Sequence, residues 1–210
     1  MIFNLYITAL ILSSLVGVIY FGKLHSALKP MVIMLVYTAV HEVVVHQEWL
    51  PNNNQAYWLY TGISSGLYLE FMRRSILNAV VKCILIILTF GFVAAGIIFS
   101  ITIGDVFPSS FINLTIPFMV LGSLMVLYSI LKNVSDQPLS SNPIFITTAA
   151  ILIYQCVFFT YLGSLNFLMD NGQLTDLLMI IFNIASIIYY SALGYAFLLS
   201  IRNMRKIEAT

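Results

Sequence analysis

The sequence predicts an all-α integral membrane protein folded as a bundle of seven transmembrane helices. Three observations lead to this fold class. Of the 210 residues, 60% are hydrophobic and only 8% are charged, whereas a soluble domain has about 45–50% apolar and about 25% charged residues. The apolar residues gather in seven segments, each close to the length that a helix needs to cross a bilayer. The basic residues are confined to alternate connections between these segments.

The composition also limits the class of function. A soluble fold of this length cannot bury so much apolar side chain, because small folds expose a large share of their surface. A cytosolic enzyme, a nucleic-acid-binding protein and a disordered tail are therefore excluded. The net charge of +1 gives no sign of a polyanionic partner. We expect the lipid bilayer to surround the chain, with no nucleic acid among its partners.

The seven predicted spans follow one another with short connections. In chain order they cover residues 2–22, 30–48, 55–72, 76–103, 111–131, 143–167 and 174–201. The first span lacks a basic start and a cleavage site before Lys23, which favours an uncleaved anchor over a signal peptide. Helix-breaking Pro, Asn, Asp and Gly residues mark the connections at 50–54, 105–108, 137–143 and 170–172. We expect one domain over residues 1–210.

The positions of the basic residues predict the orientation. All nine lie in the first, third and fifth connections, just inside the fourth span, or in the C-terminal tail: Lys23, Lys29, Arg73, Arg74, Lys82, Lys132, Arg202, Arg205 and Lys206. Cytoplasmic loops of membrane proteins collect Lys and Arg. We therefore expect a multi-pass protein of the bacterial inner (plasma) membrane, with its N-terminus outside and its C-terminus in the cytoplasm.

The order of the helices allows a parallel repeat of three spans, one linking span and three more. Aligning Pro30 with Pro143 pairs His41 with Tyr154 and Glu42 with Gln155. In the same way, aligning the basic ends of the third and seventh spans pairs Tyr60 with Tyr189. The alternative is a chance alignment of low-complexity helices.

Polar residues within the spans indicate a candidate site. An ionisable side chain in a span is costly, so it usually faces the bundle interior and has a partner there. His41 and Glu42 are the deepest such groups, and the i,i+4 spacing of Glu42 and His46 places both on one helix face. We expect His41 and Glu42 to anchor a small ligand. The other candidate ligand-binding residues are Tyr60, Tyr154, Gln155, Asn183 and Tyr189. The alternative is a polar cluster that only orders helix packing.

Glu70 and Arg74 form a second candidate pair, at the end of the third span. Their i,i+4 spacing predicts a local ion pair on the helix surface. The alternative is a cytoplasmic gate contact that links the third helix to another helix.

No motif indicates catalysis, a cofactor or a metal. A retinal protein needs a Lys in its last span, and no basic residue lies between Lys132 and Arg202. His41 and His46 are five residues apart, so they point about 140° away from each other and cannot share a metal. Cys83 and Cys156 lie inside apolar segments, where we expect buried free thiols. We therefore expect a protein that is not an enzyme.

Several motifs are distributed along the chain: Glu42 late in the second span, Tyr57, Tyr60 and Tyr68–Phe71 along the third, Asn142-Pro143 before the sixth and Tyr189-Tyr190 in the seventh. With these motifs the chain resembles a group of small seven-helix membrane proteins of Bacteroidetes. Some members of this group stand alone, and others form the N-terminal membrane module of sensor histidine kinases. The resemblance implies a sensory role with an unknown ligand. Because the sequence stops at Thr210, we expect any kinase output to come from another chain.

Three functions remain open at this stage. The first is a receptor-like protein that binds a small ligand in a central polar cavity and signals through a cytoplasmic or membrane partner. The second is a small uniporter or proton-coupled carrier, in which Glu42 and His41 titrate. The third is an accessory membrane subunit without a ligand.

Overall fold

The computed structural model describes residues 2–46, 53–133, 138–168 and 172–208, and this part of the chain is all-α. It forms seven helices: α1 Ile2–Ile19, α2 Lys29–His46, α3 Asn53–Ser75, α4 Ala79–Thr102, α5 Ser109–Lys132, α6 Pro143–Leu168 and α7 Gly172–Glu208. Three short 3-10 turns lie in the connections: η1 Phe21–Lys23, η2 Ser26–Leu28 and η3 Leu139–Ser141.

The helices overlap the seven predicted segments but differ from them at several ends; the fourth, for example, begins at Ala79 rather than at residue 76. The first helix ends at Ile19, because η1 takes up the following residues. The third continues to Ser75, and the last runs beyond residue 201 to Glu208. Arg, Met and Lys are good helix formers, so the polar tail continues the helix without an apolar face. The predicted breakers at 50–52, 137 and 170–171 lie outside the described residues.

Five of the helices are long and apolar enough to cross a membrane, namely α2, α4, α5, α6 and α7. The apolar part of α1 is shorter, at Asn4–Ile19. The 23-residue α3 is long enough but contains many Asn, Ser, Thr and Tyr residues. It packs against α2, α4 and α5, so its polar side chains face other helices rather than the surroundings of the bundle.

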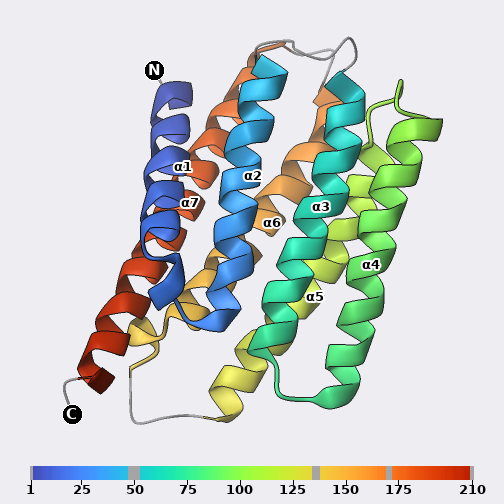
Figure 1. Cartoon of the computed structure of the whole chain (residues 1–210). Coiled ribbons are helices and arrows are strands. Elements are labelled where there is room, and N and C mark those ends of the chain that lie inside the picture. The colour runs from blue at the N-terminus through green and yellow to red at the C-terminus, as the bar shows by residue number, and fades with distance from the viewer. Residues whose placement is uncertain (1, 47–52, 134–137, 169–171, 209–210) are drawn as a thin grey trace.

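Six helices form a closed ring in the order α1, α2, α3, α5, α6 and α7, and α7 packs back against α1. The remaining helix, α4, lies outside this ring and packs mainly against α3 (Figure 1). The N-terminus and C-terminus lie at opposite ends of the bundle (Figure 1). This arrangement encloses a central space between helices that are far apart in the sequence.

The contact between α3 and α4 depends on two glycines. A Cβ atom built on Gly96 would lie 2.8 Å from the Cα atom of Gly62, so the two backbones touch. Such close approach is typical of small residues in membrane helices. Gly91 of α4 instead has open space around its Cα.

The expectation of buried thiols is wrong, because Cys83 and Cys156 are free and exposed on the outer faces of α4 and α6.

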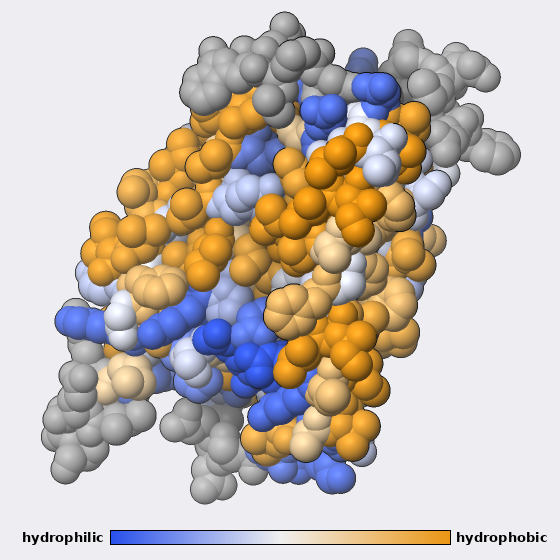
Figure 2. All heavy atoms as spheres, turned by 45° about the vertical axis from the view of Figure 1, so that its right-hand side comes forward, coloured by the Kyte–Doolittle hydropathy of each residue, from blue (hydrophilic) through white to orange (hydrophobic). Residues whose placement is uncertain are grey.

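The surface of the bundle is largely apolar. Ile87, Phe90 and Ile101 of α4 are between 67% and 79% exposed, and similar aliphatic side chains cover the outer faces of the other helices. Figure 2 shows hydrophobic residues over most of one face, with a large group of hydrophilic residues toward its lower end and a smaller group at its upper end. Because consecutive helices run in opposite directions, the positions of the basic residues in the described helices all fall at the end that carries the C-terminus. An apolar surface of this kind, with the basic residues at one end, is compatible with a multi-pass membrane protein.

Candidate functional site

A cavity of about 340 Å³ lies inside the ring. All six ring helices contribute to its wall, and Phe107 from the connection between α4 and α5 completes it at the end that carries the N-terminus. On α3 the lining extends from Tyr57 to Tyr68, which is about 16 Å at 1.5 Å per residue. The cavity therefore reaches from one end of the bundle to about its middle.

Glu42 of α2 is the acidic residue of this cavity. The hydroxyl of Tyr6 on α1 donates a hydrogen bond of 2.5 Å to Oε1 of Glu42. The ring of Tyr6 also lies against that of Tyr190 on α7, with centroids 5.7 Å apart. A side chain of α1 therefore fixes the position of Glu42, and the sequence analysis did not predict this contact.

His41 lies beside Glu42 and is held by aromatic rings of α3. Its imidazole stacks on Tyr60 with centroids 4.2 Å apart and an angle of 15° between the planes. The ring of Tyr57 lies edge-to-face with the imidazole, with centroids 5.1 Å apart and an angle of 73° between the planes. The Tyr60 hydroxyl lies 3.2 Å from that of Thr38, which ties α3 back to α2. His41 is 7% exposed, so its position is determined by packing on α3.

On the opposite side of the cavity, α6 and α7 form a similar pair. Tyr154 stacks on Tyr189 with centroids 4.6 Å apart and an angle of 18°. The hydroxyl of Tyr189 lies 2.9 Å from that of Tyr68, in hydrogen-bond contact across the ring. Tyr68 lines the cavity but Tyr189 does not. This hydroxyl pair therefore lies at the end of the cavity that is nearest the middle of the bundle.

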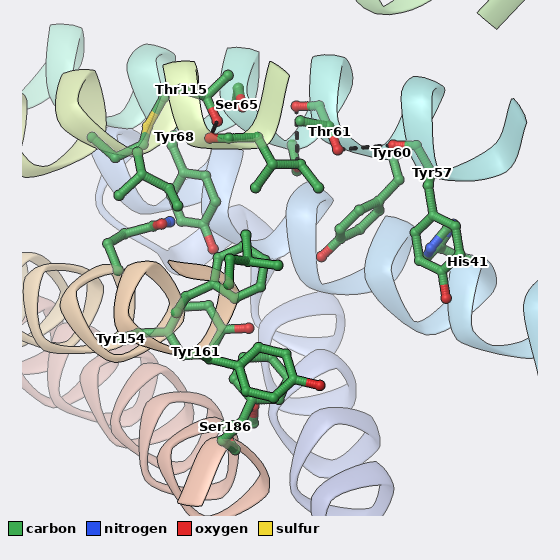
Figure 3. A pocket seen from close by; sticks show the side chains of 18 of the residues that line it. His41, Tyr57, Tyr60, Thr61, Ser65, Tyr68, Thr115, Tyr154, Tyr161 and Ser186 are labelled. Carbon is green, nitrogen blue, oxygen red and sulfur yellow. Dashed lines mark hydrogen bonds between the residues drawn. The ribbon is translucent and has the colours of Figure 1, made fainter. Parts of the chain in front are cut away.

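The hydroxyl groups of several tyrosines converge on one space. Figure 3 shows the ring ends of Tyr60, Tyr68, Tyr154 and Tyr161 directed into the cavity from α3 and α6. Ser186 of α7 also lines it (Figure 3). The lining therefore combines aromatic faces with hydroxyl groups that can donate and accept hydrogen bonds.

The structure brings most of the predicted site residues together. His41, Glu42, Tyr60, Tyr154 and Gln155 all line the cavity. Two other predicted residues, Tyr189 and the half-buried Asn183 of α7, are not among the lining residues. Both lie within one helical turn of lining residues, but the Tyr189 ring is stacked against Tyr154 and its hydroxyl is paired with that of Tyr68.

Other lining residues were missed by the sequence analysis. A signal was available on α3, where Tyr57, Thr61, Ser64 and Tyr68 recur at helical spacing and form one polar face. For Tyr6 there was no such signal, because it is a single tyrosine in an aliphatic helix.

A second hollow, a crevice of about 410 Å³ between α1 and α2, adjoins the site. Its polar lining residues are Asn4, Thr8, Glu42 and His46. Glu42 borders both this crevice and the central cavity. The predicted i,i+4 neighbour His46 lies on the crevice side.

Glu70 forms the predicted ion pair with Arg74, with Nε and Oε1 2.6 Å apart. Arg73 joins it through two hydrogen bonds of 2.6 and 2.7 Å to the same carboxylate. Arg74 also donates to the backbone carbonyl of Ser26 at 3.1 Å. The pair therefore reaches beyond its own helix to the connection between α1 and α2.

In the part of the chain that the structure describes, no three His, Cys, Asp or Glu residues come close enough to hold a metal ion. Comparison with known proteins provides no relative: no protein-family model, no curated protein and no solved structure matches this chain. The site is therefore interpreted from its own geometry.

Proposed function

We propose that the protein is a receptor-like membrane protein that binds a small ligand in the central cavity. All seven helices then cross the bilayer, with the N-terminus outside and the C-terminus in the cytoplasm. The basic residues at the C-terminal end support this orientation through the preference of Lys and Arg for the cytoplasmic side. In this orientation the cavity lies in the outer half of the membrane.

The main support for this proposal is a difference in packing along the axis of the ring, between the half that carries the N-terminus (the outer half) and the half that carries the C-terminus (the inner half). The outer half holds a cavity of a size typical of small-molecule sites. The inner half is packed shut by fully buried side chains of α2, α3 and α7, including Leu35, Phe71 and Phe197. A ligand can therefore occupy the outer half without a continuous path through the bundle.

The cytoplasmic end provides contacts through which a change in the cavity can pass to a partner. The backbone N–H of His25 donates to the Ser200 hydroxyl at 3.1 Å, which ties the first connection to α7. Asn203 of α7 donates to the carbonyl of Ser141 at 3.0 Å, which ties it to the connection before α6. A shift of α7 thus moves two connections at this end, and we propose that a signalling partner binds there.

The internal repeat is part of the proposal. The stack of His41 on Tyr60 has a counterpart in the stack of Tyr154 on Tyr189, and these are the pairs that the alignment equates. The same alignment equates further lining residues: Tyr57 with Ser186, and Thr61 with Tyr190. The ring order also repeats, with α1–α3 followed by α5–α7 and α4 outside. These observations support two related halves that face each other across the cavity.

This repeat favours a second candidate function, a small carrier. Parallel repeats with the substrate site at their interface are a common plan of secondary transporters. In a carrier, the two halves rock against each other, and the packed inner half then opens.

Two measurements test the proposal. The first is a thermal-shift screen of purified protein in lipid nanodiscs against a mixed library of neutral, anionic and cationic small molecules. We expect at least one compound to raise the melting temperature, and Ser65→Phe, which fills the cavity, to abolish that rise. Ser191→Phe on the exposed face of α7 is the matched control. If no compound of any class stabilises the protein, the receptor proposal is wrong.

The second measurement is uptake of the same compound into liposomes that contain the protein. Transport of the compound across the liposome membrane indicates a carrier.

A further inference from the structure

The charge of the cavity wall is unbalanced. Glu42 is its acidic residue, and none of the described residues that line it is Lys or Arg. His41 is packed between Tyr57 and Tyr60, and His46, which lies one helical turn from Glu42 and interacts with it electrostatically, is on the crevice side. A positively charged ligand in the cavity would place its charge directly against the Glu42 carboxylate.

The aromatic faces of the wall fit the same chemistry. Seven tyrosines and three phenylalanines line the cavity. Organic cations, and quaternary ammonium groups above all, are recognised by cages of aromatic rings, because the faces of these rings are electron-rich. A neutral polyol would use the hydroxyl groups, but it would bring no positive charge to the Glu42 carboxylate.

The two halves of the ring differ in charge at equivalent positions. The alignment of α2 with α6 equates Glu42 with Gln155, and both residues line the cavity. The side chains are similar in shape, but the amide of Gln155 is neutral and both donates and accepts hydrogen bonds. One half therefore offers a site for a cation, and the other offers a site for a neutral polar group.

We propose that the cavity binds a small organic cation, an amine or quaternary ammonium, with its charged end at Glu42 and a hydroxyl or similar neutral group toward Gln155. This inference rests on the proposed ligand-binding function and names its ligand class. The orientation of the ligand follows from the difference between the two halves.

The test compares choline with its uncharged carbon isostere, 3,3-dimethylbutan-1-ol, by calorimetry and thermal shift on the full chain in nanodiscs. We expect choline to bind more than about tenfold tighter than the isostere. Glu42→Gln should weaken choline binding by more than about tenfold and leave isostere binding unchanged, which also shows that the variant is folded. Asp176→Asn, which removes an exposed acid of α7, is the matched control and should change neither.

A charge swap tests the role of Gln155. The double variant Glu42→Gln with Gln155→Glu should recover most of the choline affinity that Glu42→Gln loses, because the carboxylate returns at the equivalent position. Three results would overturn the inference: equal binding of the isostere and choline, choline binding that is unaffected by Glu42→Gln, or no choline binding by the unmodified protein. In each case the mixed library screen still decides separately whether the cavity binds another class of ligand.

Discussion

The Tyr6 hydroxyl donates a 2.5 Å hydrogen bond to the Glu42 carboxylate, and this contact joins α1 to the acid of the central cavity. Glu42 borders both the cavity and the crevice between α1 and α2, whereas Tyr6 lines the cavity. The position of the acid therefore depends on a residue of a helix that carries no other sign of function.

Removing this hydroxyl should destabilise the protein and weaken its ligand site. Tyr6→Phe keeps the ring but leaves the carboxylate without this donor, and we expect the free energy of unfolding to fall by about 1–3 kcal/mol. Thermal unfolding in nanodiscs measures the effect. Tyr195→Phe, on a residue of α7 that is 55% exposed, should leave stability unchanged. Equal stability of the two variants would show that the Tyr6 bond does not hold Glu42.

The hydroxyl pair of Tyr68 and Tyr189 should couple α3 to α7. We expect the two single Phe variants and the double variant to give a coupling free energy of about 0.6 kcal/mol and at most about 1.7 kcal/mol, the average and the maximum found for hydrogen bonds between helices of a membrane protein. A double-mutant cycle on unfolding measures it. Additive effects of the two substitutions would mean that the 2.9 Å contact contributes nothing.

The glycine contact between α3 and α4 should be sensitive to one added methyl group. Gly96→Ala places a Cβ 2.8 Å from the Gly62 Cα, so α4 has to move outward. We expect a loss of about 1–3 kcal/mol in unfolding free energy. Gly91→Ala on the same helix meets open space and should be neutral or slightly stabilising. Similar losses in both variants would contradict the observed packing.

Much of the fold could be predicted from the sequence, because its signals are local. Apolar length located seven helices, and the basic residues marked one end of the bundle. The ends were less certain: the polar tail after residue 201 carries no apolar signal, yet it continues α7 to Glu208. Cys83 and Cys156 were wrongly expected inside, because an apolar segment is as compatible with a lipid-facing surface as with a core.

The candidate site was predicted only in part, because helical periodicity shows which residues share a face but not which helix that face meets. His41, Glu42, Tyr154 and Gln155 were found from their polarity at matching depths. The contact of Tyr6 with Glu42 joins residues 36 positions apart, and it required knowledge of how α1 packs. The absence of Tyr189 and Asn183 from the lining has the same cause, because they share a helix face with lining residues and only the packing of neighbouring side chains decides which of them border the cavity.

The central claim is that the cavity opens to the outer side of the membrane while the inner half of the ring is shut. Cysteine accessibility in intact cells tests it most directly, after the two exposed native cysteines are replaced by alanine. Thr61→Cys lies on the cavity wall, and Thr148→Cys lies at a fully buried position of α6 in the inner half. We predict that a small, charged, membrane-impermeant thiol reagent added outside labels Thr61→Cys and not Thr148→Cys. Labelling of Thr61→Cys only from the cytoplasmic side, or equal labelling of both positions, would contradict the account.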